Sequence, residues 1–286
     1  MKRSQANGIL ILVAMVWGTG FIATDGALEG FTPFWMVSIR FVIAGLLLLP
    51  FAWRGLRGLS SHDIGKGCLA GILLFLAFAF QTIGLQYTTP SKNAFLTAVN
   101  VVLVPYLIWL LMKRRPTRKQ VLCSLTCMIG VALLTLDGGL SNFSKGDVLS
   151  LICAVFFALH MMSLERYSHI PPLSLTALQL LSAGISATLI ALCTEPFPHL
   201  PSTRAFGSLL FLIFGSTLLA YLLQTWAQQH TSANTTSLIL TMEALFASLF
   251  SFLLLHEVMS VKMIIGGLII FASVVIMEWH PKGNQL

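Results

Sequence analysis

Two ionisable side chains lie deep inside long apolar stretches of this sequence, where their types could do chemistry. Glu243 follows about eight residues of its stretch, and Arg40 follows about seven residues of another. An ionised group in hydrocarbon costs several kcal/mol unless it is paired or faces water, so each residue is a functional candidate. Glu243 could bind a ligand or carry a proton, or it could be a protonated contact between helices. Arg40 could bind a carboxylate or a phosphate, extend to the membrane surface, or form an ion pair with Asp25 or Glu29.

Other polar and aromatic side chains lie in further apolar stretches. His160 could carry a proton, or it could be a neutral, hydrogen-bonded core histidine. Amide, phenol and indole groups offer hydrogen bonds and aromatic surface to a cavity, although contacts between helices explain them equally well. The residues that we expect to bind a substrate are Trp17, Gln81, Asn100, His160, Tyr221, Gln224 and Glu243. Of these, Glu243 and His160 are the candidates for proton coupling, and Arg40 is a separate candidate for an ion pair or a bound carboxylate.

No pattern of catalytic or metal-binding residues stands out in the sequence. The cysteines are odd in number, include no CxxC pair, and lie inside apolar stretches, so neither a disulfide nor a metal site is expected. The sequence contains no Walker loop, no HExxH and no GxSxG motif. We therefore expect no catalytic residues, no metal and no cofactor, and we exclude ATP-driven transport within this chain. The five cysteines are Cys68, Cys123, Cys127, Cys153 and Cys193.

Membrane-spanning helices are the elements that must position these residues. The 286-residue sequence is 56% hydrophobic and only 9% charged, and its mean hydropathy is +0.86. A water-facing surface usually needs about a quarter charged residues, so this surface must face lipid. The apolar stretches are continuous rather than alternating, which excludes a membrane barrel. We expect an all-α membrane protein with ten transmembrane helices, at about 8–27, 33–53, 64–85, 91–112, 119–136, 148–166, 173–194, 206–229, 235–255 and 261–279.

The positive charge of the chain predicts its orientation rather than a nucleic-acid partner. The formal charge is +7, but the 17 Lys and Arg residues lie mostly between the apolar stretches. Twelve of the 17 lie on the side of the N-terminus and four on the other side, and Arg40 lies within a stretch. Both termini are therefore expected in the cytoplasm, with the lipid bilayer as a partner and a bacterial inner membrane as the location. The first stretch is too long for a signal peptide and is interpreted as a retained helix.

An internal repeat divides the chain into two halves, residues 1–140 and 141–286. A shift of 143 residues aligns 80–135 with 223–278 without a gap. Five helices is an odd number, so the two copies would cross the membrane in opposite directions, as the inverted repeats of many secondary carriers do. The polar matches include Gln81 with Gln224, Thr82 with Thr225 and Lys119 with Lys262. Upstream, Pro33, Arg40 and Ala44-Gly45 align with Pro172, Gln179 and Ala183-Gly184.

Several segments resemble the EamA-type transporters of the drug/metabolite transporter superfamily. These segments are WGTGFIATDGAL (17–28), PFWMVSIRFVIAGLLLLP (33–50), LQYTTPSKNAFLTAVNVVLVPYL (85–107) and MEALFASLFSFLLLHEVMSVKMIIGGLIIFASVVI (242–276). Glu243 inside its helix and the pair His256-Glu257 are the most specific features. The resemblance implies ten spans in a five-plus-five arrangement, and a carrier or exporter of small metabolites or drugs.

The expected function is that of a secondary carrier that exports or exchanges a small metabolite, such as an amino acid or a related compound, by alternating access. A proton or a counter-substrate is a possible coupling partner. Glu243 is expected to gain and lose a proton during transport, whereas its repeat mate Asn100 cannot. Alternatives are a multidrug efflux carrier and, from other classes, a membrane-embedded enzyme or a channel. The substrate, the direction of transport and the oligomeric state do not follow from the sequence.

Overall fold

The computed structural model describes residues 2–88, 90–136, 143–198, 202–255 and 260–279, and within them every regular element is a helix. Nine helical segments in this part of the chain are long and apolar enough to cross a membrane, and Val261–Met277 is a shorter apolar helix. The expectation of an all-helical membrane protein is thus confirmed. The helices are α1 (Arg3–Leu28), α2 (Pro33–Arg57), α3 (Ser61–Leu85), α4 (Pro90–Ala98), α5 (Asn100–Met112), α6 (Arg118–Thr135), α7 (Lys145–Arg166), α8 (Pro172–Thr194), α9 (Thr203–Phe211), the π-helix η1 (Leu212–Leu219), α10 (Ala220–Gln228), α11 (Ala233–Leu240), α12 (Met242–Leu255) and α13 (Val261–Glu278).

Local signals in the sequence explain where many of these helices begin. Pro33 and Pro172 begin α2 and α8, where a missing backbone N–H costs nothing. Six other helices begin after a hydroxyl residue whose side chain accepts a hydrogen bond from the backbone N–H three residues later, a cap worth about 1 kcal/mol. These N-cap residues are Ser60, Thr117, Ser144, Ser202, Ser232 and Ser260.

Two of the expected spans are interrupted near their middles. The stretch that contains Asn100 is divided into α4 and α5 at Val99, where the N–H of Val102 donates to the Val99 carbonyl three residues earlier. The stretch that contains Glu243 is divided into α11 and α12 at Thr241, whose hydroxyl donates to a carbonyl of the preceding turn. Both features tighten or bend a helix locally. Asn100 and Glu243 therefore both lie at the start of a half-helix.

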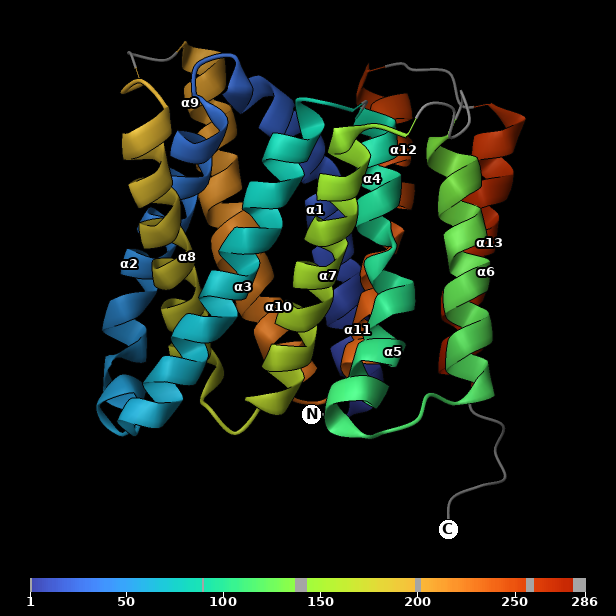
Figure 1. Cartoon of the computed structure of the whole chain (residues 1–286), viewed down its shortest axis with the longest axis horizontal. Helices are drawn as coiled ribbons and strands as arrows, with labels where there is room; N and C mark the ends of the chain where they lie inside the picture. The colour runs from blue at the N-terminus through green and yellow to red at the C-terminus, as the bar shows by residue number, and fades with distance from the viewer. Residues whose placement is uncertain (1, 89, 137–142, 199–201, 256–259, 280–286) are drawn as a thin grey trace.

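The helices stand side by side with roughly aligned axes (Figure 1), α2 and α8 near one edge and α6 and α13 at the other. α2 packs along α8, α6 along α13, α3 against α7 and α8, and α1 against α9, α10 and α12. The side chain of Lys119, near the start of α6, donates to the carbonyl of Trp279 just after α13, and Lys262 at the start of α13 donates to the carbonyl of Leu136 just after α6. The two helices are therefore antiparallel.

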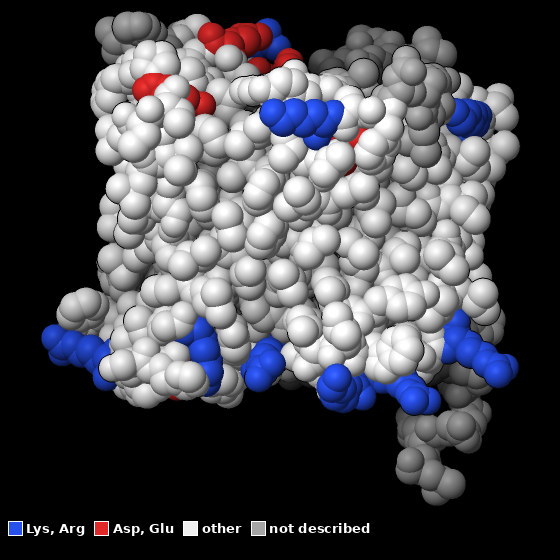
Figure 2. All heavy atoms as spheres, viewed as in Figure 1, with Lys and Arg blue, Asp and Glu red and all other residues white. Residues whose placement is uncertain are grey.

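The surface of the bundle is apolar around its middle and charged at its ends. Figure 2 shows a broad band of uncharged side chains, with Lys and Arg gathered along the end where α1 begins. Large apolar side chains point outward within this band, and Phe51, Leu110 and Leu192 are each more than half exposed. In water such a surface would be an aggregation hazard, whereas in a bilayer it contacts lipid tails.

Candidate functional site

An aromatic and polar cluster lies in the buried interior, centred on Tyr221 of α10. The ring of Tyr221 lies 5.2 Å from Trp17 of α1, 5.7 Å from Phe41 of α2 and 6.3 Å from His160 of α7, measured between ring centroids. Tyr221 and His160 are both buried. The structure thus brings together three of the residues expected in a substrate site, Trp17, His160 and Tyr221.

Arg40 belongs to the same cluster, and its guanidinium is buried. Its Nε donates a hydrogen bond of 2.7 Å to Thr217 Oγ1, and its Nη2 donates one of 3.2 Å to Ser216 Oγ. The carbon of the guanidinium lies 5.4 and 5.7 Å from the ring centres of Phe41 and Phe78, within the range of cation–π attraction. Neutral hydroxyls and aromatic rings are therefore its neighbours.

Arg40 does not have the surroundings of an ion pair at the membrane surface. Glu29 pairs instead with Arg204, at 2.9 Å, and Asp25 is exposed at the end of α1. Arg40 is 5% exposed, so its side chain does not extend to the surface either. Of the alternatives that the sequence left open for this residue, the pairing with Asp25 or Glu29 and the extension to the surface are both absent from the described structure.

The π-helix η1 holds both Arg40 and Trp17. Ser216 accepts from Arg40 through its hydroxyl, and its carbonyl accepts a 2.8 Å hydrogen bond from Trp17 Nε1. A π-helix has hydrogen bonds from residue i+5 to residue i and is rare, and π-bulges in α-helices are frequent at functional sites. The apolar stretch 206–229 predicts a plain α-helix, so the sequence signals neither η1 nor the roles of Ser216 and Thr217.

His160 is held by a chain of buried hydrogen bonds. Its Nε2 lies 2.7 Å from Oε1 of Gln179, and Gln179 Nε2 donates to Thr225 Oγ1 at 2.8 Å. An amide oxygen only accepts, so the imidazole donates from Nε2. Neither Gln179 nor Thr225 is among the site residues expected from the sequence. Their available signals were the internal alignments, in which Gln179 matches Arg40 and Thr225 matches Thr82.

Glu243 lies in the first turn of α12 and is partly exposed. Among the described residues, neither of its carboxyl oxygens has a hydrogen-bond partner. The phenol of Tyr221 is within electrostatic range of both Glu243 and Arg40. Close packing brings α12 to α1 next to this position, because a Cβ atom on Gly18 would lie 2.7 Å from the Cβ of Phe246. Glu243 therefore lies on the α12 side of the Tyr221 cluster.

The remaining expected site residues take part in other contacts. Nε2 of Gln81 lies 3.4 Å from Thr97 Oγ1, and Gln224 Nε2 donates to Gln228 Oε1 at 3.2 Å. Asn100 is partly exposed at the start of α5. Within the described part of the chain, no hydrogen bond joins these three side chains to Trp17, Arg40, His160 or Tyr221. No group of three His, Cys, Asp or Glu side chains in the same part of the chain is placed to hold a metal ion.

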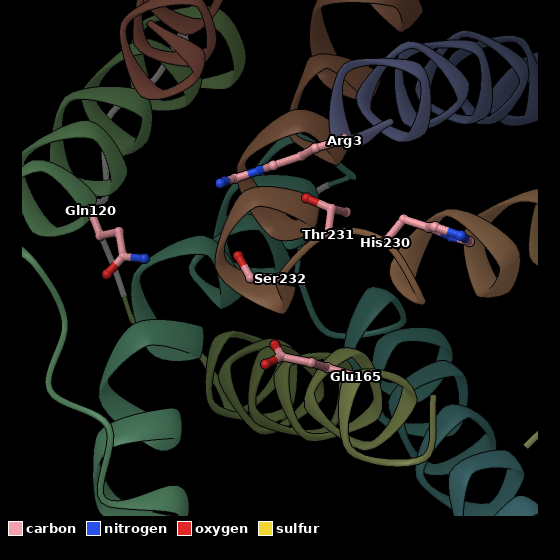
Figure 3. Close-up of a pocket in the computed structure, with 6 residues that line it drawn as sticks. All are labelled: Arg3, Gln120, Glu165, His230, Thr231 and Ser232. Carbon is pink, nitrogen blue, oxygen red and sulfur yellow. The ribbon is translucent and has the colours of Figure 1, made fainter. Parts of the chain in front are cut away.

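A polar cavity of about 450 Å³ lies at the end of the bundle where α1 begins. The side chains of Arg3, Gln120 and Glu165 extend toward the space between them, whereas the imidazole of His230 points away (Figure 3). Glu165 Oε1 accepts from Arg114 Nη2 at 2.6 Å, and its Oε2 accepts from the backbone N–H of Ala233 at 2.7 Å. Thr231 and Ser232 complete the lining. None of the seven expected substrate-binding residues lines this cavity.

One family model matches both halves of the chain. It describes the EamA-like transporter family and matches residues 6–136 and again residues 144–279. The chain belongs to the EamA-like transporter family. The resemblance drawn from the sequence is thus confirmed, although His256 and Glu257, which also carried it, lie outside the described residues. As a member of this family with many apolar helices, the chain is an integral membrane protein of the transporter class.

Relatives of this EamA-family chain match it nearly from end to end. An uncharacterized transporter of Archaeoglobus fulgidus is 34% identical over 280 residues, which cover 97% of this chain and 87% of the relative. Protein PecM of Dickeya dadantii is 25% identical over 273 residues, and the match covers 92% of this chain and 89% of PecM. A solved crystal structure with 17% identity superposes with a TM-score of 0.83 over 97% of this chain and 98% of the other. That last likeness concerns the fold.

Proposed function

We propose that this EamA-family chain is a secondary carrier that moves a small metabolite across the cytoplasmic membrane by alternating access. The observation that carries the proposal is a buried polar cluster, with Arg40 and Tyr221 at its centre, inside a bundle whose two halves match one family model. Buried ionisable residues in a membrane bundle are retained mainly where they serve a pathway. Two matching halves around such a cluster are the arrangement from which alternating access is built.

Packing between α2 and α8 supports an inverted repeat. The alignment that matches Pro33 with Pro172 also matches Val42 with Leu181 and Gly45 with Gly184. A Cβ atom on Gly45 would lie 2.7 Å from Leu181 Cγ, and one on Gly184 would lie 2.7 Å from the backbone nitrogen of Val42. The contact of Gly45 with Leu181 and the contact of Gly184 with Val42 are therefore equivalent, because each residue of one is the repeat mate of a residue of the other. A two-fold axis between the two helices requires such an exchange.

A second reciprocal pair of contacts joins α6 to α13. The shift of 143 residues matches Lys119 with Lys262 and Leu136 with Trp279. Lys119 donates to the carbonyl of Trp279, and Lys262 donates to the carbonyl of Leu136. These contacts lie at opposite ends of an antiparallel helix pair, and each is the repeat mate of the other. We infer from the two reciprocal pairs that residues 1–140 and 141–286 form inverted five-helix halves, which makes ten crossings.

The interrupted spans support a substrate site at mid-depth. The interruptions at Val99 and Thr241 lie within two residues of matching repeat positions, and each places a polar side chain, Asn100 or Glu243, at the start of a half-helix. The first turn of a helix carries a partial positive charge, and carriers of several folds place such half-helix starts at their substrates. Substrate is therefore proposed to bind between these half-helices and the Tyr221 cluster, with Glu243 or His160 carrying a coupling proton.

The orientation follows from the Lys and Arg residues at one end of the bundle. This end is proposed to face the cytoplasm, so the cavity beside Arg3 and Glu165 would be an inward-facing vestibule. The test is counterflow in liposomes that contain the purified protein. Vesicles preloaded with single unlabelled metabolites should accumulate the same labelled compound for at least one member of a metabolite panel. Flux that is never stimulated by an internal counter-substrate or by a pH gradient would contradict a carrier and favour a channel.

A further inference from the structure

Arg40 is a buried cation that forms no ion pair with any side chain in the described part of the chain. Among the Lys and Arg side chains whose exposure the structure describes, it is the only one that is buried. The ion pairs in the same part of the chain involve Asp63, Glu165 and Glu29, all at the ends of helices. A buried charge is normally paired, and removing one partner of such a pair is strongly destabilising. The lack of an ion pair for Arg40 among the described residues therefore needs an explanation.

The hydrogen bonds of Arg40 leave part of its guanidinium unused. A guanidinium has five N–H groups, arranged so that two of them can meet both oxygens of a carboxylate. In the described structure, only Nε and Nη2 donate, each to a neutral hydroxyl of η1. Nη1 has no acceptor there. The side chain is thus anchored along one edge by Thr217 and Ser216 while donors remain for a ligand.

The surroundings of Arg40 also limit what such a ligand can be. One buried cation compensates one negative charge, whereas a phosphate monoester carries nearly two at neutral pH. The neighbouring surface is aromatic, since Phe41 and Phe78 lie over the guanidinium and Trp17 shares Ser216 with it. Such walls favour an apolar body next to the charged group.

We propose that Arg40 is the residue that binds the carboxylate of the substrate, and that the substrate is a singly charged organic acid with an apolar or aromatic body. The proposal rests on the proposed carrier function and adds the chemical class of its substrate. Thr217 and Ser216 are positioning residues, because they accept hydrogen bonds from Nε and Nη2 and so fix the direction of the guanidinium. Gln179, the repeat mate of Arg40, is neutral, so the second half of the chain offers no equivalent site.

The test measures thermal unfolding of the purified protein in detergent with matched pairs of probes. The probes are monocarboxylates from butyrate to 3-phenylpropionate, each compared with its own neutral amide, and phenyl phosphate as the doubly charged compound. A ligand that binds only the folded protein raises the unfolding temperature. At least one acid should raise it by a few degrees, while its amide and phenyl phosphate at the same concentration should not.

Variants then assign the effect to Arg40. Arg40→Gln should abolish the shift produced by the acid, and Arg40→Lys should weaken acid binding at least tenfold, because an ammonium lacks the planar fork. Arg57→Gln is the matched control, since Arg57 is exposed and lies over Trp53, and it should keep the full shift. If Arg40→Gln does not fold, the acid–amide comparison and the Arg40→Lys variant still test whether Arg40 binds the carboxylate.

Three results would overturn the proposal: amides that protect as well as their acids, no protection by any acid in the series, or protection that persists in Arg40→Gln. Counterflow separates this proposal from the carrier function. A substrate found by counterflow that lacks a carboxylate, and whose transport survives Arg40→Gln, would remove the role of Arg40 and leave the carrier intact. Absence of counterflow, together with acid-specific protection, would remove the carrier and leave the binding site.

Discussion

Hydroxyl and amide groups are the hydrogen-bond partners of Arg40 and His160 inside this bundle. Arg40 donates to Thr217 and Ser216, and His160 is bonded to Gln179. A hydrogen bond from a charged group contributes about 1.5–3 kcal/mol, and removing an ion from water costs several kcal/mol, so the two bonds to hydroxyls offset a large part of the cost for Arg40. Cation–π attraction to two rings adds about 1–2 kcal/mol. These contacts stabilise the buried guanidinium of Arg40 without an ion pair among the described residues.

Glu243→Gln is predicted to remove the pH dependence of transport while leaving folding and membrane insertion nearly intact. Glutamine keeps the shape and most of the hydrogen-bonding reach of the protonated acid but cannot titrate. Counterflow rates measured across a range of pH should vary for the wild-type protein and be nearly constant for the variant. Asp25→Asn, at an exposed position, is the control and should keep the wild-type profile. An unchanged rate and profile in Glu243→Gln would make this carboxyl structural.

Gln179→Leu is predicted to lower the free energy of unfolding by about 1–2 kcal/mol. Leucine fills a similar volume but leaves His160 Nε2 and Thr225 Oγ1 without their present partner. Thermal unfolding of the purified protein measures the effect. Gln86→Leu, at an exposed helix end, should change stability by less than about 0.5 kcal/mol. Equal stability of the two variants would show that the buried hydrogen-bond chain contributes little.

Residue types identified part of the interior cluster from the sequence, because a charged or polar group stands out in an apolar stretch. Arg40, His160 and Tyr221 were found in this way, and the structure brings them together. Ser216 and Thr217 were not found, since hydroxyl residues are common in membrane helices and bond mostly to their own backbone. Their importance depends on which side chain of another helix faces them, and the sequence does not contain that information.

At the scale of helices, apolar length predicted the spans well but not their interruptions. A stretch of about 20 apolar residues must form a helix to satisfy its backbone in lipid, so composition is enough to locate it. The interruptions at Val99 and Thr241 are each confined to a single residue, and the π-helix η1 is an eight-residue segment between α9 and α10. Valine, the residue at position 99, does not break helices, and threonine, the residue at position 241, is common within membrane helices. Contacts with neighbouring helices decide such details, and these are tertiary.

Gly184→Ala is predicted to destabilise the protein by about 1–3 kcal/mol, and by more than Gly45→Ala does. The new Cβ at position 184 would lie 2.7 Å from the Val42 nitrogen and 3.1 Å from a carbonyl carbon, so the helices themselves must separate. At position 45 the closest atoms, at 2.7 and 2.8 Å, belong to the flexible end of Leu181. Thermal unfolding compares the two variants.

The control for these glycine variants is Gly8→Ala, because a Cβ at position 8 has nothing within 4 Å. Alanine there should be neutral or stabilising by up to about 1 kcal/mol, since it favours the helix more than glycine does. If Gly184→Ala is as harmless as Gly8→Ala, α2 and α8 are not packed as closely as the structure places them, and the reciprocal contact loses its support for a two-fold axis.

At the scale of the whole molecule, two reciprocal contacts lie far apart, one in the α2–α8 pair and one in the α6–α13 pair. Each reciprocal contact involves four residues that the internal alignments match in pairs, and two such contacts at distant places are not expected by coincidence. Such an axis in the membrane plane makes the two halves equivalent in shape but opposite in direction, so an outward-facing state has an inward-facing counterpart of similar energy. The charged residues break this equivalence, because Arg40 and Glu243 have the neutral mates Gln179 and Asn100. The two-fold symmetry would then provide the outward-facing and inward-facing states, and the charged residues Arg40 and Glu243 would determine the direction of transport.

The orientation of the two halves gives the last prediction. With five crossings in each half, a reporter fused after Gly139 should lie outside the cytoplasm, and a reporter fused after Lys282 should lie inside it. Alkaline phosphatase, active only outside, and a fluorescent protein that folds only inside provide complementary signals at each position. The Lys and Arg residues near the start of α1 and the start of α6 favour the cytoplasmic side for both ends of the chain. Reporters on the same side at both positions would require an even number of crossings between them, which inverted five-helix halves do not allow.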